Sequence, residues 1–143
     1  MNLPINFFFE NTKIGLRDRN HLKAFISKQI RSRGRKLENL NYIFCGDDAL
    51  KNMNRVHLGH NYFTDIITFD LSESSKIIHA EIYISADRVR DNSRTFNSPV
   101  YRELHRVIFH GVLHLLGYQD KSEADIRKMR EMENRWMEAY FGK

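Results

Sequence analysis

Two histidines stand four residues apart within residues 110–120, His-Gly-Val-Leu-His-Leu-Leu-Gly-Tyr-Gln-Asp. In a helix this spacing places the imidazoles of His110 and His114 one turn apart on one face. Gly117 suits the end of that helix, because glycine readily adopts the left-handed conformation that turns the chain back. Asp120 then supplies a carboxylate. Two imidazoles and one carboxylate are typical of a catalytic zinc site with a position left open for water. The segment therefore predicts one Zn²⁺ per chain, bound by His110, His114 and Asp120.

Two other interpretations of these residues stay open. A His-x-x-x-His pair on a helix can be a packing or surface feature, and Asp120 can cap the helix that begins near Ser122. The neighbours of the histidines favour the metal site, because they make the helix apolar on nearly all sides and so predict that it is buried. Buried imidazoles need polar partners, and a metal ion is one. The apolar neighbours are Val107, Ile108, Phe109, Val112, Leu113, Leu115 and Leu116.

The same spacing also resembles the metalloprotease motif His-Glu-x-x-His-x-x-Gly-x-x-His, in which the glutamate is the general base. Here that position is Gly111, which has no side chain. The protease interpretation therefore lacks its catalytic group. For phosphodiester hydrolysis the base must come from another residue, which the sequence does not assign.

Positive charge is concentrated in residues 13–36. The chain carries a net charge of +5, and this segment has nine Lys or Arg residues against one acid, Asp18. A concentrated basic segment is typical of proteins that bind a polyanion, although a solvated helix face can have the same composition. We expect the phosphates of such a partner to be contacted by the densest part of the segment, Arg31, Arg33, Arg35 and Lys36.

The composition bounds the class of protein. A chain of 143 residues has the length of one domain, so a single hydrolase domain over residues 1–143 is expected. No apolar run reaches the roughly 18 residues of a membrane span, and Phe7-Phe8-Phe9 lacks the features of a signal peptide. Cys45 is the only cysteine and has no internal disulfide partner. These features favour a cytoplasmic protein that does not bind membranes.

Hydrophobic periodicity and turn residues predict an α+β fold. The strands 66–69 and 77–84 are close enough in sequence for an antiparallel pair, and the longer connections carry helices and allow parallel pairs. The sequence thus predicts a mixed four-stranded sheet packed with about five helices. Strands are expected over 5–9, 40–44, 66–69 and 77–84, and helices over 18–33, 47–58, 86–96, from Pro99 to Gly117, and from Ser122 to about 141. Asp47 or Asp48 is expected to cap the second helix and Gly59 to end it, and Ser122 is expected to cap the last helix.

Three segments resemble the YbeY family of bacterial rRNA maturation factors and metal-dependent endoribonucleases. The histidine segment matches the family signature His-Gly-x-Leu-His-Leu-x-Gly-Tyr-Asp-His through Tyr118. Residues 63–69, Phe-Thr-Asp-Ile-Ile-Thr-Phe, are similar to the family's Pro-Thr-Asn-Val-Leu-Ser-Phe. Residues 80–85, Ala-Glu-Ile-Tyr-Ile-Ser, are similar to Gly-Asp-Ile-x-Ile. The segments follow the family's order, so the resemblance covers nearly the whole chain.

The resemblance implies the family's fold, with the histidine helix buried centrally. It also implies a zinc-dependent, single-strand-specific endoribonuclease that acts in rRNA maturation and ribosome quality control, with the ribosome or ribosomal proteins as partners. The chain departs from the family pattern at two positions. Asp120 replaces a third ligand histidine, and Leu58 stands where the family usually has an arginine. Arg55, one helical turn earlier, is the candidate catalytic residue in its place.

A second function stays open beside the nuclease. A ribosome-assembly or RNA-binding factor without catalytic activity would use the same basic segment and hold a structural zinc. The metalloprotease is a third interpretation, which Gly111 disfavours.

Overall fold

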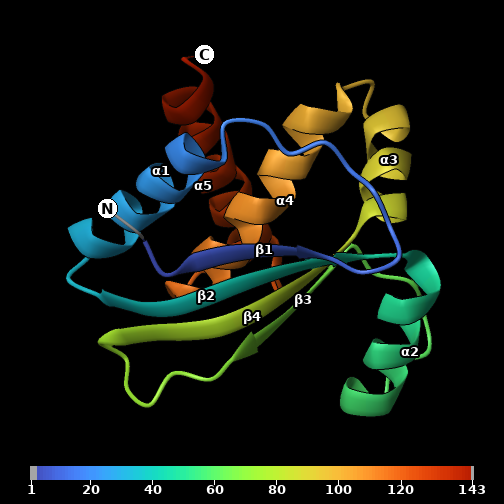
Figure 1. Ribbon diagram of the computed structural model, residues 1–143, viewed down its shortest axis with the longest axis horizontal. Helices are drawn as coiled ribbons and strands as arrows, with labels where there is room; N and C mark the ends of the chain where they lie inside the picture. Colours follow the sequence, from blue (N-terminus) through green and yellow to red (C-terminus); the bar gives the residue numbers. More distant parts are fainter. Residues whose placement is uncertain (1–2, 143) are drawn as a thin grey trace.

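The computed structural model describes residues 3–142. Its four strands form one mixed sheet in the order β1-β2-β4-β3 (Figure 1). β1 pairs with β2 and β2 with β4 in parallel, whereas β3 and β4 are antiparallel. The predicted α+β fold is therefore confirmed. In chain order the elements are β1 (Ile5–Phe9), α1 (Arg19–Ser32), β2 (Lys36–Cys45), α2 (Asp47–Leu58), β3 (Ile66–Asp70), β4 (Ile77–Ser85), α3 (Ala86–Thr95), α4 (Val100–Leu115) and α5 (Glu123–Phe141).

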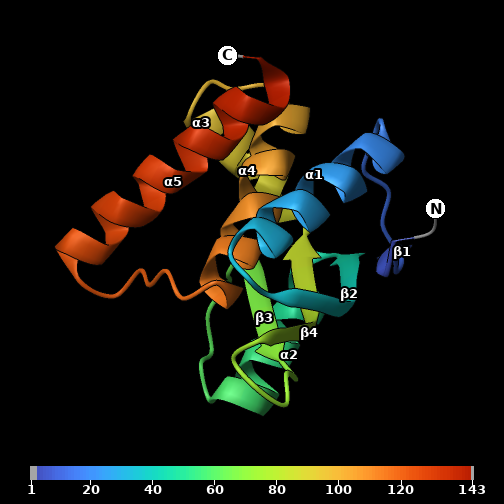
Figure 2. The same cartoon turned by 90° about the vertical axis from the view of Figure 1, so that its left-hand side faces the viewer.

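The helices divide unequally between the two faces of the sheet. α1, α3, α4 and α5 lie on one side and α2 lies towards the other (Figures 1 and 2). The side chains of β4 contribute to the cores on both faces of the sheet, because successive strand residues point to opposite faces. Ile82 and Ile84 belong to the large core under α1 and α4, and Tyr83 packs against a small core under α2. This small core includes Cys45, and burial raises the pKa of its thiol to about 11.

The histidine helix α4 is buried on most sides, as its sequence predicts. Ten of its residues are buried, and it packs on the sheet and against α5. Gly111 lies close to the sheet. A Cβ atom at this position would lie 2.9 Å from Cδ1 of Ile82 and 3.0 Å from Cδ1 of Ile66. Position 111 therefore faces the core, and its lack of a side chain lets α4 lie close to β3 and β4.

Several local expectations are confirmed. The side chain of Ser122 caps α5 by accepting from the Asp125 N–H, with 3.1 Å between Oγ and N. Gly59, with φ of 71°, ends α2 in the left-handed conformation. Gly117, with φ of 107°, turns the chain away from α4. No helix in the part of the chain that the structure describes is both long and apolar enough to span a bilayer.

Two local expectations are wrong. β2 begins at Lys36, earlier than the predicted 40, because its first residues pair with the start of β4. The N-cap of α2 is Gly46, without a side-chain hydrogen bond, in place of Asp47 or Asp48. The Asp47 carboxylate instead accepts from Ser85 Oγ at 2.8 Å and from Arg88 Nε at 3.0 Å. Asp47 therefore makes tertiary contacts instead of the local cap of α2 that the sequence predicts.

The close approach at Gly111 predicts an energetic coupling between α4 and β4. Gly111→Ala gains about 1 kcal/mol of helix propensity but overpacks the contact at a cost of about 1–3 kcal/mol. Ile82→Val removes the Cδ1 atom that a new Cβ would meet. The two substitutions together should destabilise the fold by about 1 kcal/mol less than the sum of the single variants, measured by urea unfolding.

Ile78→Val provides the matched control, because Ile78 is also buried on β4 but does not meet position 111. Gly111→Ala and Ile78→Val should be additive. Additivity in the Ile82 pair as well would contradict the packing described here.

Candidate functional site

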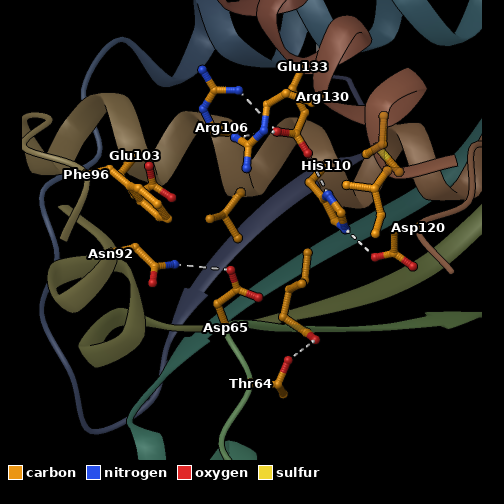
Figure 3. A pocket seen from close by; sticks show the side chains of 14 residues that line it. Thr64, Asp65, Asn92, Phe96, Glu103, Arg106, His110, Asp120, Arg130 and Glu133 are labelled. Carbon is orange, nitrogen blue, oxygen red and sulfur yellow. Dashed lines mark hydrogen bonds and ion pairs between the residues drawn. The ribbon is translucent and has the colours of Figure 1, made fainter. Parts of the chain in front are cut away.

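A cavity of about 460 Å³ opens between α3, α4, α5 and the start of β3 (Figure 3). Concave sites that collect converging polar side chains are the usual places for ligands and catalysis. Most of the polar side chains that line this cavity are ionisable, and they come from segments distant in sequence. They are Thr64, Asp65, Asn92, Glu103, Arg106, His110, Asp120, Arg130 and Glu133.

His110 is oriented by a buried carboxylate on α5. Its Nδ1 lies 2.7 Å from Oε2 of Glu133. The other carboxylate oxygen, Oε1, accepts from Arg106 Nη1 at 3.1 Å and pairs with Arg130 Nη1 at 3.2 Å. A carboxylate on one imidazole nitrogen fixes the ring and directs the other nitrogen towards a ligand. Glu133 thus turns Nε2 of His110 into the cavity.

The charge of Glu133 is maintained despite its burial. Burial by itself raises the pKa of this carboxyl, but the hydrogen bond and charge of His110 and the two arginines outweigh burial, so the pKa is lowered. The pKa of His110 is raised in turn. Burial opposes its charged form, and the hydrogen bond to Glu133 with the negative charges of Glu133 and Asp120 outweighs that effect.

Asp120 lies on the opposite edge of the His110 ring. Its Oδ2 is 3.4 Å from Nε2 of His110, and its side chain is exposed. Two ligands bound to one tetrahedral zinc at about 2.0–2.2 Å are separated by about 3.4 Å. The pair therefore fits the nitrogen and oxygen donors of a zinc site. The alternative role of Asp120 as a helix cap is wrong, because Ser122 caps α5.

The structure does not bring His114 to this pair. His114 lies in the last turn of α4, exposed, and does not line the cavity. Within residues 3–142, no three His, Cys, Asp or Glu side chains lie close enough to hold a metal ion together. The expectation that both imidazoles are buried holds only in part: His110 is half-buried and His114 is not. Glu133 of α5 contacts Arg106 and His110 of α4. His114 lies one helical turn beyond these contacts.

Arg55, the candidate catalytic residue, also lies outside the cavity. It is exposed on α2, and its Nη2 donates to Oδ1 of Asn52 at 2.7 Å. The cations that line the cavity are Arg106 and Arg130. Arg106 stands one helical turn before His110, and this spacing indicates from the sequence that the two residues share one helix face. Glu133 comes from a helix 23 residues further on and has no local signal.

Two further carboxyls reach the cavity from different elements. Asp65 precedes β3 within the family-like segment 63–69, and its Oδ2 accepts from Asn92 Nδ2 at 3.3 Å. Glu103 lies on α4 and is buried. Burial raises the pKa of both carboxyls above the usual range. A carboxyl with a raised pKa can exchange protons closer to neutral pH, which is the property required of a general acid or base.

The four basic candidates lie where α1 passes into β2, beside the C-terminal end of α4. Arg35 Nη1 donates to the Leu115 carbonyl at 3.4 Å. The guanidinium of Arg33 lies 5.5 Å from the centre of the Trp136 ring. Arg31 and Lys36 are exposed. Arg33 and Arg35 therefore have structural contacts of their own, whereas Arg31 and Lys36 extend from the surface.

Comparisons with known proteins agree with the sequence resemblance. The model of the family described as Endoribonuclease YbeY matches residues 8–141. Endoribonuclease YbeY of Cytophaga hutchinsonii is 45% identical over 130 residues, 91% of each chain. That of Parabacteroides distasonis is 38% identical over 133 residues, 93% of each chain. The solution structure of a Thermotoga maritima protein aligns with a TM-score of 0.66 and 27% identity, over 96% of this chain and 89% of that one. With nearly its whole length matched by the family model, this chain belongs to the endoribonuclease YbeY family.

Proposed function

We propose that this endoribonuclease binds one zinc ion and cleaves single-stranded RNA, acting in rRNA maturation and ribosome quality control in the cytoplasm. The observation that carries the proposal is the row Glu133–His110–Asp120 in a cavity that also holds arginines and two further carboxyls. Family membership supports RNA as the substrate. An rRNA substrate would bring the enzyme into contact with the ribosome or its proteins, which are therefore the proposed partners.

His110, Asp120 and His114 are the side chains that would bind the zinc. His110 and Asp120 stand at ligand separation. His114 follows one turn later on α4 and would complete the site only by turning its exposed ring towards them. When bound, zinc lowers the pKa of a water ligand and polarises a phosphoryl oxygen. Glu133 accepts the Nδ1 proton of His110, which leaves the Nε2 lone pair for the metal.

The remaining cavity residues suit a phosphodiester. Arg106 and Arg130 neutralise Glu133 and place positive charge where a phosphate would enter. Asp65 and Glu103 are buried acids on the same cavity, and Asp65 is held by Asn92. They are the candidates for the proton transfers that cleavage needs, a role for which the sequence proposes no residue.

The alternative functions have less support. A structural zinc site is usually closed by four protein ligands, whereas this cavity is open and Asp120 is exposed. A metalloprotease would need its base at position 111, which faces Ile82 and Ile66 in the core. A glutamate at this position could not reach the cavity.

Zinc content should depend on the three ligands and on no other histidine. Tag-free wild type should contain one zinc per chain by elemental analysis, and His110→Ala, Asp120→Ala and His114→Ala should each lose zinc affinity. Asp120→His should retain zinc, because imidazole and carboxylate bind it at similar distances of about 2.0–2.2 Å. His79→Ala, at a histidine on β4, is the control. Unchanged zinc in the His110 and His114 double variant would refute the site.

RNA cleavage should depend on His110 and on the carboxylate that orients it. Wild type should cleave unstructured RNA faster than a duplex of the same sequence, and His110→Ala should abolish cleavage. Glu133→Gln should lower the rate by about 10- to 100-fold, the usual effect of losing a residue that orients a ligand. All proteins must be purified free of contaminating nucleases, with His79→Ala as the active control. Equal rates for wild type and His110→Ala would contradict the proposal.

RNA affinity should fall with salt through the basic segment. Each phosphate contact on a single strand contributes a slope of about −0.7 to log affinity against log salt concentration. Replacing Arg31, Arg33, Arg35 and Lys36 by Gln should flatten the slope, and Arg31→Gln with Lys36→Gln should do so without loss of thermal stability.

The control for a loss of positive charge elsewhere on the surface replaces Arg94 and Arg135 by Gln. These arginines pair with Asp91 and Glu131 on helix surfaces. This variant should keep the wild-type slope. An unchanged slope in the fourfold variant would move the RNA surface elsewhere.

A further inference from the structure

Three aromatic side chains near the cavity are exposed. Phe96 is 62% exposed, Tyr62 55% and Phe63 46%. Phe96 lines the cavity where α3 ends, and Tyr62 and Phe63 directly precede Thr64 and Asp65, which line it from the start of β3. We call Tyr62, Phe63 and Phe96 the aromatic row. Apolar groups left in solvent beside a binding cavity indicate an interaction surface.

One face of α3 connects Phe63 with Phe96. Arg88, Asn92 and Phe96 follow at intervals of four residues and therefore share a face. The guanidinium of Arg88 lies 5.4 Å from the centre of the Phe63 ring. Asn92 donates to Asp65 (Figure 3). Arg88 and Phe96 are separated by about 12 Å along the helix. Phe63 and Phe96 thus lie near the two ends of this face, and Asn92 between them holds Asp65.

Tyr62 is held in place although its side chain is exposed. The buried side chain of Asn54 donates to the Tyr62 carbonyl at 3.1 Å. The Tyr62 hydroxyl lies 3.0 Å from Nδ1 of His60, and the two rings stack with centres 5.2 Å apart. Little conformational freedom remains to be lost when a ligand binds.

Positive charge accompanies the rings. Lys51 Nζ lies 4.6 Å from the centre of the Phe63 ring. Arg88 is already paired with Asp47 and Asp91, so Lys51 supplies the net positive charge. Aromatic rings for bases and cations for phosphates are the combination that binds single-stranded nucleic acid. A protein partner would cover the rings without requiring the cation.

We propose that the aromatic row binds unpaired bases of single-stranded RNA and guides the strand across the cavity mouth, with Lys51 on the phosphate backbone. The inference rests on the proposed function and deepens it. In a duplex the bases are paired and stacked on one another, so their faces are not available to the rings. The row therefore supplies a physical reason for a preference for single strands.

The test compares two labelled strands of equal length, oligouridine and an abasic ribose-phosphate strand with the same phosphates. Wild type should bind oligouridine more tightly. Phe96→Ala and Tyr62→Ala should each weaken oligouridine binding by about 5- to 150-fold and leave abasic binding unchanged. Phe96→Trp should retain affinity, and its exposed indole should be quenched by oligouridine, whereas the buried Trp136 should not respond.

Phe8→Ala is the matched control, because Phe8 is also exposed but lies on β1, at the opposite edge of the sheet from β3. It should bind both strands like wild type. The inference alone would be overturned if wild type cleaves RNA while the Ala variants keep their oligouridine affinity, or lose affinity equally for both strands. A protein partner would then be the ligand of the aromatic row. A wild type that neither binds nor cleaves RNA would overturn the proposed function, and the inference with it.

Discussion

The contact between Glu133 and His110 is the interaction on which the site depends. A buried carboxylate is costly unless its charge is compensated, and here an imidazole and two guanidiniums surround it. The same contacts join α5 to α4 and fix the ring of His110. One group of charges therefore serves both the packing of two helices and the orientation of the candidate ligand. This dual use explains why a polar network persists beside the core.

The position of α4 on the sheet also determines where His110 lies. Gly111 allows the helix to lie against Ile66 and Ile82. His110, the preceding residue, then points towards Glu133 of α5 and into the cavity (Figure 3). Because α4 is held by the sheet on one side and by α5 on another, the imidazole has little freedom to move. Such rigidity is what a site needs when its ligands must meet a fixed geometry.

The cavity combines opposite charges that serve different purposes. Glu133 is kept ionised by its cationic neighbours, whereas burial raises the pKa of Asp65 and of Glu103. Carboxyls in one cavity thus differ in their readiness to bind a proton. The arginines, the half-buried imidazole and the exposed ring of Phe96 surround this acidic centre. A strand of RNA would meet rings at the mouth and charges within.

Local patterns in the sequence determined the element order, the caps at Ser122 and Gly117 and the burial of α4, because each depends on neighbours a few residues away. The spacing of His110 and Asp120 around a glycine turn likewise indicated that they meet. Only the tertiary structure decided that Glu133 orients His110, that His114 is exposed and that Arg55 lies outside the cavity. It also decided that Asp47 turns to Ser85 and Arg88 instead of capping α2. These outcomes depend on contacts between elements distant in sequence, whose relative heights and rotations are set by core packing and have no local signature.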